Sequence, residues 1–242
     1  MSGGAEVAEG RLRVFVDLEN RGAAPVYDLA VDAELAGEFA RASLDATVAP
    51  GERERVALGF PPRVPRPGLH ALILRIDFRA GEPPAPEDTP RSSQLAFLIL
   101  PLGGQPNPAL ALRVAQGDVV LRGTSRVQLE SLDGADHRVQ LRVHTAPGLA
   151  AHPRELELAL PGGGRVDAEL GLLRSGAGDH TRHGILVEAR VLDGPVSRSA
   201  VSAGVVEVKA RPNRVRSASR PALALAAAAI VAAIALEIRR RR

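Results

Sequence analysis

The sequence predicts an all-β protein, built as two tandem β-sandwiches followed by one C-terminal transmembrane helix. Three observations predict this architecture. Short runs of alternating apolar and polar residues are separated by Gly or Pro about every ten residues, as in β-sandwiches. The second half of the chain repeats the order of the first half. An uncharged stretch, ALALAAAAIVAAIAL, lies at 222–236.

The strands of the first half follow from this alternation. Residues 1–10 are small and acidic and are expected to be disordered. A strand then begins at Arg11, and its turn is Asn20-Arg21-Gly22. One face of this strand carries Leu12, Val14, Val16 and Leu18. Further strands are expected at 26–33, 53–60, 69–78 and 94–100.

The second half matches the first at a nearly constant offset. HALILRIDF at 70–78 corresponds to HGILVEARV at 183–191, and the Pro-Gly pair at 50–51 corresponds to the pair at 161–162. This repeat predicts a duplicated domain. The expected organisation is a first sandwich at 11–101, a linker at 102–108, a second sandwich at 109–210, a basic juxtamembrane linker at 211–220, a helix at 221–238 and an Arg tail at 239–242.

The repeat exposes a difference at the start of the chain. The second half has an extra strand-like segment at 109–121, ahead of the strand expected at 126–132. Its counterpart in the first half would lie near or before residue 1, or be built from residues 5–9. A truncated or mis-annotated N-terminus is therefore the favoured expectation.

The order of three segments resembles bacterial Ig-like modules of the CARDB and NEW3 type. VDLENRGAAPVYDLAV, VAPGERERVAL and RPGLHALILRIDF stand at 16–31, 48–58 and 66–78. The resemblance covers about residues 11–100, and in the second half Leu132-Asp133-Gly134 replaces the Asn-Gly turn. It implies two Ig-like sandwiches and an accessory or adhesion-like role on an envelope protein. The Cys pair and core Trp of true immunoglobulin domains are missing.

The C-terminal stretch is predicted to be a membrane anchor. As a helix, residues 221–238 would span roughly 27 Å, close to a hydrocarbon core of about 30 Å. A soluble helix packed on the domain would need a polar face at 3.6-residue spacing, which 222–236 lacks. The flanking basic residues are Arg214, Arg216, Arg220, Arg239, Arg240, Arg241 and Arg242.

The orientation of this anchor is not decided by its flanking charges. Lys209 and four Arg precede the span, and four Arg follow it. Because the last four abut the span directly, an inside C-terminus with extracytoplasmic domains is favoured. The opening MSGGAEVAEG has no apolar signal region. A mis-set start codon, or a tail-anchored protein facing the cytoplasm, stays an alternative.

The distribution of charge along the chain limits the classes of partner that are expected. Residues 1–208 hold 22 Arg against 27 Asp and Glu, a net −5, whereas 209–242 hold nine basic residues and Glu237, a net +8. A basic cluster beside a span suits anionic lipid headgroups. With one Tyr, five Phe and no Trp, stacking surfaces for nucleic acid are absent. Membrane lipid and a protein or cell-surface glycan are the expected partners, and nucleic acid is not.

No catalytic or metal motif is predicted. Asp179, His180 and His183 cluster, but an i, i+3 pair of His points to opposite faces of a strand. His137 and His144 are separated by odd spacing in the same way. The glycines at 162–164 precede a strand and are interpreted as a hairpin turn. No enzyme activity, metal or cofactor is expected.

The candidate binding feature is an acidic, proline-rich loop, EPPAPEDTP at 82–90. Its prolines reduce the entropy lost on docking, and a basic partner or cation could meet Glu82, Glu87 and Asp88. The edges of the sandwiches are a second candidate, through strand addition.

The function expected from the sequence is therefore non-catalytic. The protein is interpreted as a single-pass membrane protein whose tandem domains bind, space or assemble other components at the bacterial cell envelope. The alternatives are an accessory subunit of a membrane transport or secretion complex, a tail-anchored cytoplasmic adaptor and a membrane-tethered enzyme.

Overall fold

The computed structural model describes residues 2–8, 11–61, 66–82, 90–103 and 107–210. These residues form strands and no helix, which confirms the predicted all-β class. Residues Met1–Lys209 make one compact unit. The predicted membrane helix at 221–238 lies outside the described residues. Within the described part, no helix has the length and apolar character needed to cross a bilayer.

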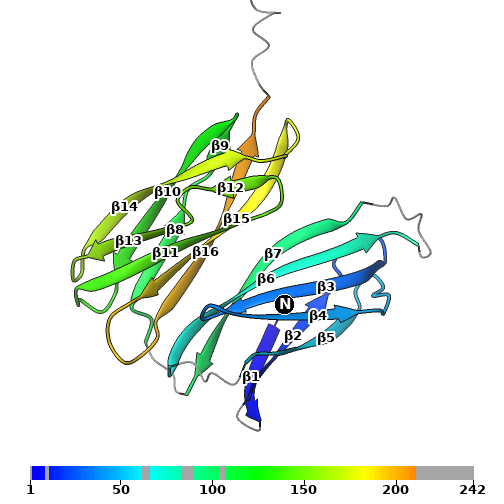
Figure 1. Ribbon diagram of the computed structural model, residues 1–242, viewed down its shortest axis with the longest axis horizontal. Helices are drawn as coiled ribbons and strands as arrows, with labels where there is room; N and C mark the ends of the chain where they lie inside the picture. The colour runs from blue at the N-terminus through cyan, green and yellow to red at the C-terminus, as the bar shows by residue number, and fades with distance from the viewer. Residues whose placement is uncertain (1, 9–10, 62–65, 83–89, 104–106, 211–242) are drawn as a thin grey trace, which may run out of the picture. The chain divides into compact units, whose positions relative to one another are not determined.

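Two sheets form the first sandwich (Figure 1). One has the strand order β1–β2–β5, and the other has the order β4–β3–β6–β7. All neighbouring pairs are antiparallel. The strands are β1 (Ser2–Ala8), β2 (Arg11–Glu19), β3 (Val26–Leu35), β4 (Glu38–Leu44), β5 (Arg53–Gly59), β6 (Gly68–Ala80) and β7 (Ser92–Leu102).

Period-two alternation along these strands builds the core between the sheets. From one sheet come Val14, Val16 and Leu58, and each is at most 2% exposed. Leu72 and Leu74 of β6 meet them from the other sheet and are fully buried. The alternation predicted for β2 and β5 is thus confirmed.

The second sandwich has nine strands joined into one continuous sheet. β9 links the two layers, because it pairs antiparallel with β10 and parallel with β16. One layer contains β12, β14 and β10, and the other contains β16, β15, β11 and β13. The strands are β8 (Leu110–Val114), β9 (Gly117–Val119), β10 (Arg122–Ser131), β11 (His137–Thr145), β12 (Leu149–Ala151), β13 (Glu155–Leu160), β14 (Arg165–Arg174), β15 (Thr181–Val191) and β16 (Ser199–Val208).

The two sandwiches have the same strand plan. β2, β3, β5, β6 and β7 correspond to β10, β11, β14, β15 and β16. A matching backbone bond fixes the equivalence at the end of the second strand. Asn20 N–H donates to Glu52 O at 3.0 Å, and Ser131 N–H donates to Gly164 O at 3.1 Å. Asn20 and Ser131 are therefore equivalent positions.

The start of the chain differs from the expectation of disorder. Ser2–Ala8 form β1, which pairs with β2 from Ser2 opposite Asp17 to Ala8 opposite Arg11. Its glycines and alanines give little local strand signal, so alternation could not find it. The backbone edge of β2 supplies the ladder that orders it.

Two further details differ from the sequence prediction. Asp28 has a φ of 53°, and the β3–β6 register shifts between Tyr27 and Ala30. This bulge buries Leu29 and Ala30 consecutively and breaks the expected alternation. The turn at 161–164 is not a hairpin, because β13 pairs with β11 whereas β14 pairs with β10. It carries the chain from one layer to the other.

Candidate partner-binding site

A groove opens at one edge of the first sandwich, between the end of β2 and β7. Its volume is about 670 Å³, within the range of about 300–1,000 Å³ common for ligand sites. Apolar side chains that pack on the edge of the core form its floor, and the β2–β3 turn closes one end. The apolar floor consists of Leu18, Leu29, Val48, Ile76, Phe78 and Ala96.

The groove lies where the β1–β2 ladder stops. β1 is the strand described on the outer edge of β2, and its pairing ends at Ser2 opposite Asp17. On the inner edge, Asn20 exchanges hydrogen bonds with the β5 side, to Glu52 O at 3.0 Å and from Gly51 N–H at 2.7 Å. Because bonding direction alternates along an antiparallel strand, the N–H and C=O of Glu19 point to the outer edge, beyond the end of described β1.

In the second sandwich the same place is filled. Leu132 N–H donates to Ala109 O at 2.8 Å, and β8 continues the ladder with Ala111 opposite Glu130. Ala109 and Leu110 are 2% and 6% exposed and belong to the core. The position of Glu130 corresponds to that of Glu19. The second sandwich therefore has β8 beside Glu130, at the place that corresponds to the groove next to Glu19.

A pair of glycines confirms this alignment of β1 with β8. In the second sandwich, a Cβ on Gly204 of β16 would lie 2.6 Å from a methyl group of Val114. In the first, a Cβ on Gly3 would lie 2.7 Å from a methyl group of Leu98 in β7. In the first sandwich the glycine lies on β1 and the branched side chain on β7. In the second sandwich the branched side chain lies on β8 and the glycine on β16. Gly3 thus corresponds to Val114, and Leu112 corresponds to Met1, which lies outside the described residues.

Asn20 shapes the end of the groove. Its side-chain amide donates to Ala24 O and Val48 O, both at 2.9 Å, and its Oδ1 accepts from Gly22 N–H at 2.9 Å. These bonds hold the β2–β3 turn in one conformation. The predicted Asn-Arg-Gly turn is therefore a structural wall of the groove.

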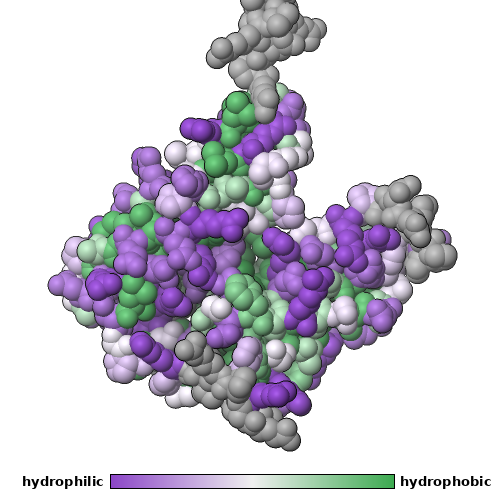
Figure 2. Space-filling view, in the orientation of Figure 1, coloured by the Kyte–Doolittle hydropathy of each residue, from purple (hydrophilic) through white to green (hydrophobic). Residues whose placement is uncertain are grey.

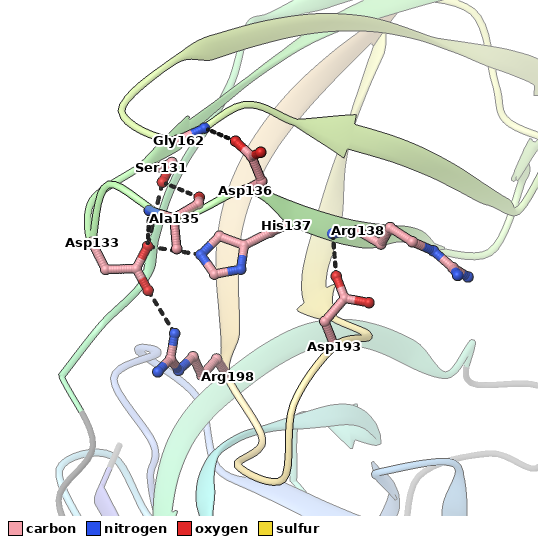
Figure 3. Close-up of polar contacts among 9 residues, drawn as sticks. All are labelled: Ser131, Asp133, Ala135, Asp136, His137, Arg138, Gly162, Asp193 and Arg198. Carbon is pink, nitrogen blue, oxygen red and sulfur yellow. Dashed lines mark hydrogen bonds and ion pairs between the residues drawn. The ribbon is translucent and has the colours of Figure 1, made fainter.

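The corresponding turn of the second sandwich is built on Asp133 (Figure 3). Asp133 accepts from His137 Nε2 at 2.7 Å and from Arg198 Nη1 at 2.5 Å. The His137 bond, followed by the Ala135 amide and the Arg198 charge, holds the pKa of Asp133 below its ordinary value against the effect of desolvation. Ser131 donates to Ala135 O at 3.1 Å rather than to His137. These bonds hold the turn in one conformation. The Ser131 hydroxyl donates to a backbone carbonyl and is not arranged as a nucleophile.

A second hollow of about 680 Å³ lies where β3 and β4 of the first sandwich approach β11 of the second. Arg142 ion-pairs with Glu34 and, at 2.6 Å, with Glu155. Beside it a small cluster of Ala71, Ile73 and Leu186 is buried. Phe39 lines the hollow and is 70% exposed.

The residues singled out from the sequence are only partly described. Glu82 is exposed, whereas Glu87, Asp88 and the Arg residues that flank the anchor lie outside the described residues. Asp179 pairs with Arg174 at 2.6 Å, and His183 contacts Thr181 Oγ1 at 2.9 Å. Within the described part of the chain, no group of three or more His, Asp or Glu could hold a metal.

Sequence reasoning did not identify the groove. Alternation marks Leu18 and Ile76 as core residues, and nothing in their sequence neighbours shows that they line a groove. The available signal was the repeat itself, because the segment at 109–121 has no full counterpart in the first half. Figure 2 shows hydrophobic residues interspersed among hydrophilic ones on the visible face.

Comparisons with known proteins show distant structural likeness only. No family model matches the chain, and no curated protein matches it. A red sea bream transglutaminase structure is 15% identical with a TM-score of 0.30, over 88% of this chain and 31% of that one. A Porphyromonas gingivalis W83 protein of unknown function is 14% identical with a TM-score of 0.29, over 85% and 96% of the two chains. The chain thus spans less than a third of the transglutaminase.

Proposed function

We propose that the protein is a non-catalytic binding or spacer module, in which two Ig-like sandwiches of the CARDB and NEW3 type are held at a membrane by a single C-terminal span. The observation that carries the proposal is the sequence order, two duplicated all-β units followed by 15 uncharged residues between Arg clusters. The bacterial cell envelope, with the domains outside the cytoplasm, is the favoured location.

The binding role is supported by surface features rather than by reactive groups. The groove of the first sandwich has an apolar floor, and an exposed apolar surface favours recognition of another molecule. The polar clusters at Asp133 and Arg142 are paired internally. Membrane lipid is the proposed partner of the basic C-terminal segment.

Membrane fractionation with a matched truncation tests the anchor. The full chain should sediment with membranes, resist alkaline carbonate and enter the detergent phase. A variant ending at Lys209 should remain in the aqueous fraction, because it lacks the apolar stretch. Aqueous partitioning of the full chain with its tail intact would reject the anchor.

Protease treatment of intact cells tests the orientation. Digestion of residues 1–208 from outside would support envelope display. Protection of those residues in intact cells, with digestion after lysis, would support the tail-anchored cytoplasmic adaptor instead. Co-purification of a stoichiometric membrane complex in mild detergent would favour an accessory subunit.

A further inference from the structure

We infer that the second hollow, where β3 and β4 of the first sandwich approach β11 of the second, binds a small organic acid that carries one carboxylate on an apolar or aromatic body. The hollow measures about 680 Å³, within the range of about 300–1,000 Å³ common for ligand sites. The inference rests on the proposed binding role and names the class of ligand. It is carried by two guanidinium groups without a partner, by the charge balance of the lining and by an exposed aromatic ring.

Two arginines, one from each sandwich, line the hollow and are available to bind an anion. Arg75 lies on β6, and Arg154 lies just before β13. Within the described part of the chain, neither side chain has an ion pair or a hydrogen bond. Asp32 is opposite Arg75 on β3, but its carboxylate pairs with Arg41 at 3.5 Å. A guanidinium presents only donors, in a fork that matches a carboxylate.

The charge of the lining favours a ligand with a single negative charge. Four arginines and three carboxylates line the hollow, a net charge of +1 when His144 is not counted. The carboxylates of Glu34 and Glu155 both pair with Arg142, so the lining neutralises most of its own charge. A phosphate monoester carries a charge of about −1.5 to −2 at pH 7 and would exceed this balance. One carboxylate matches it.

Phe39 provides the apolar contact for the body of the ligand. Its side chain lines the hollow and is 70% exposed, whereas Leu132, the next of the exposed large apolar residues of the described chain, is 52% exposed. Half-buried Leu95 and buried Ile73 continue the apolar lining on β7 and β6. A ring or an aliphatic chain placed against these side chains would remove apolar surface from water, which favours binding.

Backbone bonds hold the two sides of the hollow together. Leu69 N–H of the first sandwich donates to Ser197 O of the second at 2.9 Å, and Ser197 N–H donates to Pro67 O at 2.8 Å. Arg142 of the second sandwich also pairs with Glu34 of the first. Because these contacts position both sides before a ligand arrives, less entropy is lost on binding.

A fluorinated acid and its neutral analogue test the class of ligand. The probe is a trifluoromethyl-substituted benzoate, and the control is the corresponding benzamide, which has the same ring without the charge. With the full chain in mild detergent, fluorine NMR should show saturable line broadening of the benzoate, with an affinity about tenfold or more above that of the benzamide. Detergent without protein gives the baseline. Equal affinities of the two compounds would overturn the inference.

A second comparison tests the apolar contact. Trifluoroacetate, which has the charge without the ring, should bind more weakly than the benzoate. Phe39→Ser should weaken binding of the benzoate and leave binding of trifluoroacetate unchanged. An equal affinity of the wild-type chain for both acids would show that the hollow attracts any anion, and would overturn the inference.

Variants matched in charge test the location. Arg75→Gln and Arg154→Gln should each weaken benzoate binding by about threefold or more, and the double variant by about tenfold or more. Neither substitution breaks an ion pair of the described residues, so both variants should unfold at the wild-type urea midpoint. Arg126→Gln removes the same charge from an exposed position outside the hollow and should leave binding unchanged. Equal effects of the three single variants would overturn the inference.

The binding experiment and the membrane experiment fail independently. Absence of saturable benzoate binding to the wild-type chain would overturn the inference and leave the fractionation of the full chain unchanged. Aqueous partitioning of the full chain would reject the anchor and leave benzoate binding unchanged.

Discussion

Asn20 shows how one buried polar side chain determines the shape of the groove. The residue is 9% exposed, and its amide satisfies three backbone groups at 2.9 Å. Since buried backbone groups need partners, the side chain takes the place of strand neighbours that the turn lacks. The wall of the groove therefore depends on Asn20 rather than on the exposed residues that follow it.

Replacing this residue should be costly. Asn20→Ala removes the partner of the Ala24 carbonyl and the Gly22 amide and one of two donors to the Val48 carbonyl, which keeps the Val26 N–H, and should lower the free energy of unfolding by about 1–3 kcal/mol. Urea denaturation measures the change. Arg21→Ala is the matched control, because the Arg21 side chain is 77% exposed, and it should change stability by less than about 0.5 kcal/mol. Equal effects of the two variants would contradict the role given to Asn20.

Asp133 makes the stability of the second sandwich sensitive to acid. Its pKa is lowered in the folded state, first by the His137 hydrogen bond and then by the Ala135 amide and Arg198. The unfolded chain therefore takes up this proton at a higher pH than the folded chain. The stabilisation is complete above the ordinary Asp pKa of about 3.9 and is lost as pH falls below it.

An isosteric amide tests this contribution. Asp133→Asn should be less stable than the wild-type chain near neutral pH, and the difference should shrink as pH falls through the range below about 4. Asp45→Asn, at an exposed position, is the control. Equilibrium unfolding across pH provides the measurement. A constant difference between Asp133→Asn and the wild-type chain would argue against the carboxylate as the titrating group.

At the level of strands, both sandwiches pack a glycine against a large side chain at equivalent positions, but the two residue types are exchanged between the strands. The first places a glycine on β1 against Leu98 of β7, and the second places Val114 of β8 against Gly204 of β16. Close packing leaves room for one large side chain at each site. The sequences of the paired strands are therefore coupled, although each looks arbitrary alone.

A double-mutant cycle should reveal this coupling. Gly204→Ala brings a methyl group to 2.6 Å from Val114 and should destabilise the protein by about 1–3 kcal/mol. In a Val114→Ala background the clash is relieved, so the cost of Gly204→Ala should fall, with a coupling energy of about 0.5–3 kcal/mol. Thermal or urea unfolding of the four proteins measures it. Additive effects would mean that the two residues do not share this space.

The strands that could be predicted from the sequence are those whose own residues alternate or form an apolar run. The features that could not be predicted depend on contacts between strands far apart in the sequence. β2, β5 and β6 have alternating or continuous apolar residues, so their strands and buried faces could be predicted from sequence alone. β1 could not, because Ser2, Gly3 and Gly4 acquire strand structure from the edge of β2. The bulge at Asp28 and the groove depend on contacts between distant strands, which local patterns do not contain. The acidic loop at 82–90 was predicted as a binding feature from its composition. Of its three candidate residues, only Glu82 is among the described residues.

For the compact unit as a whole, Arg142 links the two sandwiches. Its guanidinium meets Glu34 of β3 and Glu155 of β13, and the Glu34 side chain is 17% exposed. Arg142→Ala leaves Glu34 partly buried without its partner and should cost about 1–3 kcal/mol. Arg41→Ala, at a side chain 67% exposed, should cost less than about 0.5 kcal/mol. Calorimetry measures both, and similar effects would argue against a linking role for Arg142.

His70 should make the stability of the compact unit sensitive to mild acid. Burial lowers the pKa of His70, opposed by its bond to Arg66 O at 2.7 Å and by nearby Glu188, while Arg190 adds to the lowering. The unfolded chain binds this proton as pH falls through the ordinary His pKa of about 6.5, whereas the folded chain binds it only at lower pH. The free energy of unfolding is therefore highest above that pH and decreases below it. His70→Gln removes the titration and should reduce the slope of unfolding free energy between about pH 6.5 and 5 by at most about 1.4 kcal/mol per pH unit. Urea titrations of both proteins across this range measure the slopes, and identical slopes would show that His70 binds its proton equally in the folded and unfolded chains.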